Sequence, residues 1–216
     1  MNHIILLDLD GTLTDPKEGI TKSVQHALQA YGINEQDLDK LCPFIGPPLS
    51  DSFKEYYGFS EAQAREAIGY FHEYFTKQGM FENKVYPGIT HLLKKCREQG
   101  KKVILATSKP QIYAKQILKH FELAEYFDDI QGSSMDGSKI HKEDVIQSAL
   151  SDNQITDMQE VLMIGDRKHD VLGSGKFGIS CVGVLYGYGS REELETCGAK
   201  WNVDTVEDLA AYLQRI

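Results

Sequence analysis

Two aspartates follow directly on the first apolar run of the chain. The run Ile4-Ile5-Leu6-Leu7 has the composition of a buried strand, and Asp8 and Asp10 lie two positions apart at its end. Because side chains alternate along a strand, residues two apart share a face. Gly11 permits a tight turn, after which the N–H groups of Gly11 and Thr12 would be donors for an anion. Two carboxylates for a divalent cation beside amide donors suit phosphate chemistry.

Two further polar clusters begin where an apolar run ends. The first follows residues 103–106 and the second follows residues 161–164. In open α/β sheets, ligands bind at the carboxyl ends of the strands. Each residue alone has a structural explanation, as a turn former or a helix cap, but their coincidence at successive strand ends favours one shared site. The clusters contain Thr107, Ser108 and Lys109, and then Asp166 and Asp170.

A lysine precedes the helix that we expect at residues 143–150. Two positions fit, Lys142 and Lys139. A lysine in such a place is commonly a solvated surface charge. The alternative is that it is a fourth polar group of the site at the strand ends.

Hydrophobic patterning divides the chain into two kinds of region. Helical spacing prevails in the region from residue 15 to about residue 80, with helices expected at 21–31, 37–41, 51–57 and 60–78, and Ser60 with Gln63 forms a capping box. Elsewhere helices alternate with apolar strands, which are expected at 4–7, 102–106, 127–131, 161–164, 180–184 and 199–203. We predict an α/β fold: a doubly wound, Rossmann-like parallel sheet core of residues 1–14 and 82–216, with a helical domain inserted at 15–81.

Composition narrows the function classes. The chain has 216 residues, 41% hydrophobic and 25% charged, and a formal net charge of −9. An acidic chain without a basic stripe is a poor nucleic-acid binder. The apolar run at the N-terminus stops at Asp8, far short of a signal peptide or a membrane span, so we expect a cytoplasmic protein without membrane contact. Scattered cysteines without a zinc-like spacing are expected to be buried or inert thiols: Cys42, Cys96, Cys181 and Cys197.

The four clusters together resemble the haloacid dehalogenase superfamily, and the resemblance covers the whole chain. Its opening motif is similar to Asp8-Leu9-Asp10-Gly11-Thr12-Leu13-Thr14, and its second motif corresponds to Thr107. The fourth corresponds to Gly165-Asp166 with Asp170. The third is a single lysine, which we assign to Lys142 with Lys139 as the alternative.

The resemblance implies a two-step phosphoryl transfer. Asp8 would attack phosphorus and form an aspartyl phosphate, while Asp10 would act first as acid and then as base. Lys142 would stabilise the Asp8 carboxylate. Mg²⁺ would be bound by Asp8, Asp166 and the carbonyl of Asp10, with Asp170 supporting the metal or the lysine. The phosphoryl oxygens would be held by Thr107, Ser108, Lys109, Gly11, Thr12 and the Asp10 amide.

The inserted helical domain resembles the C1 type of cap, which closes over the site and contacts the leaving group. Gly46 and Leu49 belong to the segment that corresponds to the specificity loop, although the same segment is equally typical of a rigid turn followed by a Ser50 helix cap. β-Phosphoglucomutases carry an arginine where Leu49 stands, so a phosphatase is favoured over a mutase.

The resemblance is strongest to phosphatases of the phosphoglycolate-phosphatase-like and 5'-nucleotidase-like kind. We therefore expect a small phosphorylated metabolite, such as a nucleoside monophosphate or phosphoglycolate, as substrate. A sugar phosphomutase and a non-catalytic scaffold that binds phospho-ligands are the alternatives. The expected assembly is a monomer or a homodimer.

Overall fold

The fold is taken from a computed structural model that describes residues 3–216. The chain divides into two compact units. One comprises the residues up to Asp15 together with Val85–Ile216, and we call it the α/β unit. The other, Pro16–Lys84, is the helical unit. These boundaries lie within three residues of those expected from the sequence.

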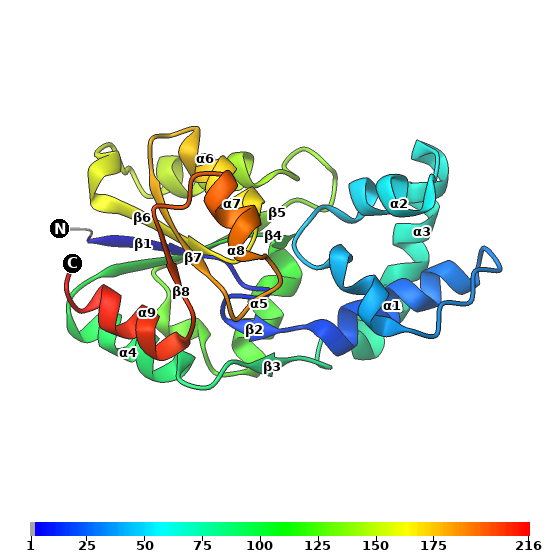
Figure 1. The fold of residues 1–216 in the computed structure, drawn as a ribbon, viewed down its shortest axis with the longest axis horizontal. Coiled ribbons are helices and arrows are strands. Elements are labelled where there is room, and N and C mark those ends of the chain that lie inside the picture. Colours follow the sequence, from blue (N-terminus) through cyan, green and yellow to red (C-terminus); the bar gives the residue numbers. More distant parts are fainter. Residues whose placement is uncertain (1–2) are drawn as a thin grey trace. The chain divides into compact units, whose positions relative to one another are not determined.

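The α/β unit is built on a six-stranded parallel sheet with the order β5-β4-β1-β6-β7-β8 (Figure 1). The chain runs outward from β1 on one side and then returns to build the other side, which makes the fold doubly wound. The strands are β1 (Ile4–Leu7), β4 (Lys102–Pro110), β5 (Asp129–Ser133), β6 (Val161–Gly165), β7 (Ser180–Val184) and β8 (Trp201–Val203).

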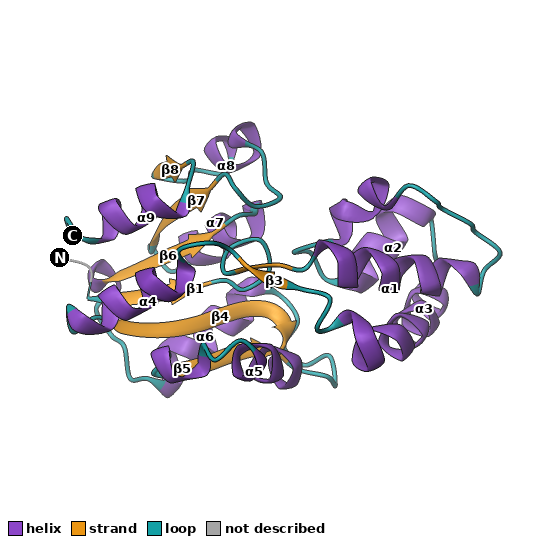
Figure 2. Cartoon of the chain, turned by 90° about the horizontal axis from the view of Figure 1, so that it is seen from below, coloured by secondary structure: helices purple, strands orange, loops and turns teal. Residues whose placement is uncertain are grey.

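Helices cover both faces of this sheet, as Figure 2 shows. One face carries α4 (Ile89–Glu98), α5 (Gln111–His120) and α9 (Val206–Leu213). The other carries α6 (Lys142–Asp152), α7 (Lys168–Gly175) and α8 (Arg191–Thr196). Short 3₁₀ helices, η3 (Ala124–Tyr126) and η4 (Met158–Glu160), precede β5 and β6. Because the sheet is covered on both sides, its strands are apolar throughout rather than alternating.

The register of the central strands aligns their ends. Leu7 of β1 pairs with Leu105 of β4 on one side and with Ile164 of β6 on the other. These residues are fully buried and fix the three strands against one another. The residues that follow them therefore emerge at the same edge of the sheet.

The helical unit consists of α1 (Lys17–Gln29), the 3₁₀ helix η1 (Leu38–Phe44), α2 (Leu49–Tyr57), α3 (Glu61–Tyr74) and the π-helix η2 (Phe75–Gly79). Its core contains packed aromatic rings: the centroids of Phe44 and Phe53 lie 5.0 Å apart, and those of Phe53 and Phe59 lie 5.6 Å apart. The predicted capping box is confirmed, since the Ser60 hydroxyl accepts from the Gln63 N–H and Gln63 Oε1 accepts from the Ser60 N–H.

The predicted Ser50 helix cap is wrong. Helix α2 begins at Leu49 with Pro48 in the capping position, and no side chain caps it. Proline has a φ suited to a helix start, so the helix begins earlier than the hydroxyl suggested. Two short strands that the sequence did not predict, β2 (Thr14–Asp15) and β3 (Lys84–Val85), pair with each other where the chain leaves and re-enters the α/β unit.

Candidate active site

Three buried aspartates meet at the carboxyl edge of the sheet. Asp8 follows β1, Asp166 follows β6, and Asp170 lies in the first turn of α7. One carboxylate oxygen from each lies within 4.8 Å of the others, and none of the three residues is more than 4% exposed. The strand register therefore brings together acids that are separated by about 160 positions in the sequence.

Lys142 lies between two of these acids. It is the first residue of α6, and its ammonium lies 2.7 Å from Asp8 Oδ1 and 2.7 Å from Asp170 Oδ1. It also donates to the Ala106 carbonyl at 3.0 Å. Burial alone would lower the pKa of Lys142, but the carboxylates of Asp170 and Asp8 outweigh it and hold the pKa above its ordinary value. The lysine is therefore charged in this buried position.

Lys139 lies elsewhere. Its ammonium donates to Gln131 Oε1 at 3.2 Å, and its backbone closes the turn that begins at Ser134. Of the two lysines that the sequence left open, Lys142 is the one in contact with Asp8.

The cluster of Asp8, Asp166 and Asp170 has three carboxyl groups but only one buried ammonium, that of Lys142, in contact with them among the residues that the structure describes. Burial raises the pKa of Asp166 well above its usual range, and the neighbouring Asp170 and Asp8 carboxylates raise it further. The pKa of Asp170 rises to about 6, mainly through burial, although Lys142 opposes the shift. Among residues 3–216, Asp166 Oδ1 is buried without a hydrogen-bond partner. A divalent cation would neutralise the excess charge and satisfy this oxygen, so the residues present fit Mg²⁺.

A second buried ion pair joins Asp10 to Lys109. The Lys109 ammonium lies 2.5 Å from Asp10 Oδ2, and both side chains are less than 10% exposed. Burial raises the pKa of Asp10, and Lys109 holds that rise in check. Lys109 was predicted to lie at the substrate, and its contact with Asp10 was not predicted. The sequence signal for it was that both residues come shortly after apolar runs, at residues 4–7 and 103–106.

Thr107 and Ser108 directly precede Lys109 near the carboxyl end of β4. Thr107 is buried, and its hydroxyl accepts from the Lys109 N–H at 3.3 Å. Ser108 is half-buried. The threonine therefore lies beside the Asp10–Lys109 pair as a polar group of the site.

The turn after Asp10 is shaped by Gly11. Its φ of 83° lies in the left-handed region, and a Cβ there would be 2.1 Å from Asp166 Oδ2. The Gly11 N–H donates to the Thr14 carbonyl at 2.8 Å, and the Thr12 N–H donates to the Leu9 carbonyl at 3.3 Å. The prediction that these amides face an anion is therefore wrong for this conformation, because both donors close the turn itself. Gly11 instead makes room for the Asp166 carboxylate.

The loop between β7 and α8 lies against Asp166, a contact that was not predicted from the sequence. The Tyr188 N–H donates to Asp166 Oδ2 at 2.7 Å. A Cβ on Gly187 would lie 2.4 Å from Asp166 Cβ, and one on Gly189 would lie 1.9 Å from the Asp166 carbonyl oxygen. The signal was the alternation of glycine and tyrosine in this loop, which permits close backbone approach.

Gly46 and Leu49 lie in the helical unit. Gly46 has a φ of 105° in the bend before α2, and Leu49 is half-buried at the start of that helix. Their role as a specificity loop stays a prediction.

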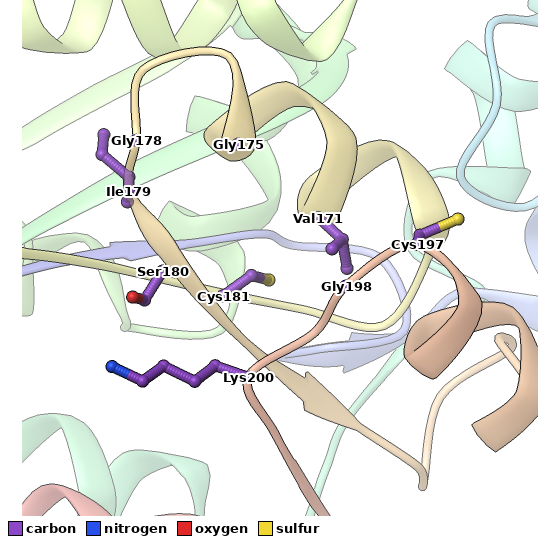
Figure 3. Close-up of a pocket in the computed structure, with 9 residues that line it drawn as sticks. All are labelled: Val171, Gly175, Gly178, Ile179, Ser180, Cys181, Cys197, Gly198 and Lys200. Atoms are coloured by element: carbon purple, nitrogen blue, oxygen red, sulfur yellow. The ribbon is translucent and has the colours of Figure 1, made fainter.

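A separate cavity of about 310 Å³ lies on the α/β unit (Figure 3). None of the carboxylates described above lines it. Its walls come from α7, β7 and the segment before β8, and they include Val171, Cys181, Cys197 and Lys200. This cavity is distinct from the acidic site.

No helix within residues 3–216 has the length and the apolar composition that a membrane span needs.

Residues 5–184 match the family model of the haloacid dehalogenase-like hydrolases. The chain belongs to this family. A 5'-nucleotidase of Pseudomonas aeruginosa is 49% identical over 88% of this chain and 86% of its own length. The structure of a predicted phosphatase from Clostridium acetobutylicum has a TM-score of 0.98 and 48% identity, with both chains covered completely. Tyrosine-protein kinase PtkA of Mycobacterium tuberculosis is 37% identical over 89% of this chain and 65% of its own length. Within the haloacid dehalogenase-like hydrolases, this chain is a phosphatase.

Proposed function

We propose that this phosphatase is an Mg²⁺-dependent phosphomonoesterase that forms an aspartyl phosphate on Asp8. The observation that carries the proposal is the buried cluster in which the carboxylates of Asp8, Asp166 and Asp170 lie within 4.8 Å of one another, with Lys142 2.7 Å from Asp8. Such a cluster has an excess of negative charge that a divalent cation balances. It also places the Lys142 ammonium in direct contact with the carboxylate of the proposed nucleophile.

The metal would be held by the carboxylates of Asp8 and Asp166 and by the Asp10 carbonyl. When bound, Mg²⁺ neutralises charge on the phosphoryl group and lowers its repulsion with the nucleophile. Asp170 would act chiefly through Lys142, since it lies 2.7 Å from that ammonium. The Arg167 N–H donates to its other oxygen at 3.1 Å, which fixes the carboxylate in place.

Asp8 would attack phosphorus, and the bond to the leaving oxygen would break. Asp10 would donate a proton to that oxygen and later accept one from the water that cleaves the aspartyl phosphate. The burial that raises the pKa of Asp10 favours its protonated form, while Lys109 prevents the shift from becoming extreme. Thr107, Ser108 and Lys109 would contact the phosphoryl oxygens.

We propose a small phosphorylated metabolite as substrate, with nucleoside monophosphates first among the candidates. The 5'-nucleotidase at 49% identity supports this choice over phosphoglycolate. The helical unit would set the choice of leaving group, with Gly46 and Leu49 in its specificity segment. A cytoplasmic location and a monomeric or homodimeric assembly belong to the same proposal.

The test is hydrolysis by the purified chain with Mg²⁺ and with a chelator. We expect turnover of an aryl phosphate and a higher kcat/KM for a nucleoside monophosphate than for phosphoglycolate or a hexose phosphate. Asp8→Asn should abolish turnover, while Asp204→Asn, which alters an exposed partner of Arg191, should leave it unchanged. Wild-type turnover by Asp8→Asn would overturn the mechanism.

Transfer to a hydroxyl group rather than to water is a separate outcome of the same assay. The kinase PtkA makes a tyrosine peptide the natural competing acceptor to include. Interconversion of hexose phosphates would favour the mutase alternative, and turnover of none of these compounds would favour the scaffold.

A further inference from the structure

We propose that Tyr188 is a positioning residue that holds the metal carboxylate Asp166 in a fixed relation to Asp15, the last residue of the α/β unit before the chain enters the helical unit. The inference rests on the proposed metal role of Asp166. Tyr188 makes two contacts, one from each end of the residue. The Tyr188 N–H donates to Asp166 Oδ2 at 2.7 Å, and the Tyr188 hydroxyl donates to Asp15 Oδ1.

The backbone around Tyr188 has little freedom to move independently of Asp166. The glycines on either side would place a Cβ 2.4 Å from Asp166 Cβ and 1.9 Å from the Asp166 carbonyl oxygen. The loop backbone therefore lies directly against Asp166 at both glycines, with no room for a side chain between them. The Tyr188 amide therefore acts as a rigid partner of the Asp166 carboxylate, of the kind that orients a metal ligand.

The hydroxyl end of Tyr188 contacts the chain where it leaves the unit. Asp15 is the second residue of the short strand β2, and Pro16 follows it as the first residue of the helical unit. A hydrogen bond to a carboxylate is among the stronger kinds in proteins, and this one is partly buried. The hydroxyl therefore restrains Asp15 relative to the loop.

A second tyrosine of the same loop has similar contacts. The Tyr186 hydroxyl donates to the Thr12 carbonyl at 3.1 Å, and its ring packs against Tyr86 with centroids 5.0 Å apart. Tyr86 directly follows Val85, where the chain returns to the α/β unit. The loop thus contacts both passages of the chain, and of these two tyrosines it is Tyr188 that donates to the Asp166 carboxylate.

The consequence is coupling between the metal site and the linker at Asp15. Binding of Mg²⁺ to Asp166 would order the Tyr188 amide, and through the tyrosine ring it would order Asp15. Loss of the hydroxyl should loosen the linker and weaken its response to Mg²⁺, while the amide contact to Asp166 is kept.

Hydrogen exchange followed by mass spectrometry tests this coupling in the full chain. In Tyr188→Phe, we expect amide exchange in the peptide spanning residues 13–20 to be about tenfold faster than in wild type, the effect of losing one charge-assisted hydrogen bond. Saturating Mg²⁺ should slow exchange of this peptide in wild type but not in the variant. Without metal, the peptide spanning residues 4–9 should exchange at the same rate in the variant and in wild type. Tyr126→Phe, which removes a hydroxyl from η3, is the matched control and should behave as wild type.

A double-mutant cycle with Asp15 separates the proposed contact from general loosening. Asp15→Ala should reproduce the exchange of Tyr188→Phe, and the two changes together should add nothing further. Asp15→Asn keeps an acceptor oxygen and should restore most of the protection. Additive effects of the two changes would overturn the link.

Kinetics provide a readout that a purely structural role would not move. We expect Tyr188→Phe to raise the apparent KM for Mg²⁺ on the order of threefold to tenfold, with kcat within twofold of wild type. Identical KM values and identical exchange in the variant and wild type would overturn the proposal. A wild-type chain without Mg²⁺-dependent hydrolysis would instead overturn the proposed function. In that case, amide exchange of peptide 13–20 in metal-free wild type and Tyr188→Phe still tests the contact between the Tyr188 hydroxyl and Asp15.

Discussion

The Lys142 ammonium lies 2.7 Å from the Asp8 carboxylate, with both side chains at most 6% exposed. Charges in such a position are stable only while they are paired, because each has lost most of its hydration. The ion pair therefore contributes to the fold as well as to the proposed nucleophile. The two contributions can be measured separately.

Replacing this lysine should destabilise the protein strongly. Lys142→Met would leave Asp8 and Asp170 buried without their cation, and we expect a loss of about 3–5 kcal/mol in the free energy of unfolding. Urea denaturation with chelator present measures it. Lys139→Met, which removes a half-buried contact to Gln131, is the control and should cost less than about 1.5 kcal/mol. Equal losses in the two variants would contradict the assignment.

Asp166→Asn should change stability in opposite directions with and without metal. In the metal-free protein, the folded-state pKa of Asp166 is raised, so the folded state binds more protons than the unfolded state above pH 3.8. Wild-type stability therefore falls, relative to the variant, as pH rises from about 4 towards 8. With Mg²⁺, wild type should gain about 2.7 kcal/mol at a hundredfold excess over Kd, and the variant much less.

Thermal denaturation of wild type and Asp166→Asn across this pH range, in chelator and in Mg²⁺, gives four curves of stability against pH. Subtracting the curve of the variant from that of wild type cancels the contribution of the other carboxyl groups. A variant that is no more stable than wild type in chelator at pH 8 would show that the Asp166 charge is compensated in some other way.

Lys109→Met should move the pH dependence of turnover upwards. Lys109 lowers the pKa of Asp10 against the effect of burial, so its removal lets that pKa rise further. If Asp10 must lose its proton to activate water, the acid limb of kcat shifts to higher pH. Profiles between pH 5 and 9 measure the shift, and Lys109→Arg should preserve the wild-type limb. If the acid limb of the kcat profile of Lys109→Met is not shifted, Asp10 is not the group whose titration limits turnover.

Gly11→Ala should impair metal binding while the fold persists. Its Cβ would lie 2.1 Å from Asp166 Oδ2, and the φ of 83° disfavours any side chain. We expect the affinity for Mg²⁺ to fall by roughly 10-fold to 100-fold, as for the loss of a ligand's support. Calorimetric titration with Mg²⁺ measures it. Gly69→Ala, in open space within α3, is the matched control and should stabilise the protein by about 0.5–1 kcal/mol. Unchanged Mg²⁺ affinity in Gly11→Ala would contradict the close packing.

Much of the fold followed from the sequence because its signals are local. The strands Ile4–Leu7 and Ser180–Val184 were predicted to the residue. The α/β class is confirmed by the parallel sheet and by the phosphatase structure at a TM-score of 0.98. Strands β2 and β3 were not predicted, because two residues are too few to show a period.

The candidate site was predictable only in part. Asp8, Asp166 and Lys142 could be placed together because each follows a strand or starts a helix at one sheet edge. The Asp10–Lys109 pair and the Tyr188 contacts depend on side-chain conformations and on a loop without periodicity. The Gly11 amide was expected to face an anion, but the turn satisfies it internally, since a buried N–H needs a partner.

The pairing of β2 with β3 has a consequence for engineering. Paired strands lie about 5 Å apart, so the two ends of the helical insertion are close neighbours in space. A segment with adjacent ends can be exchanged for one of different length without stretching the sheet core. The stretch between Asp15 and Val85 is therefore a position where insertions of another length can be grafted while the six-stranded sheet stays unchanged.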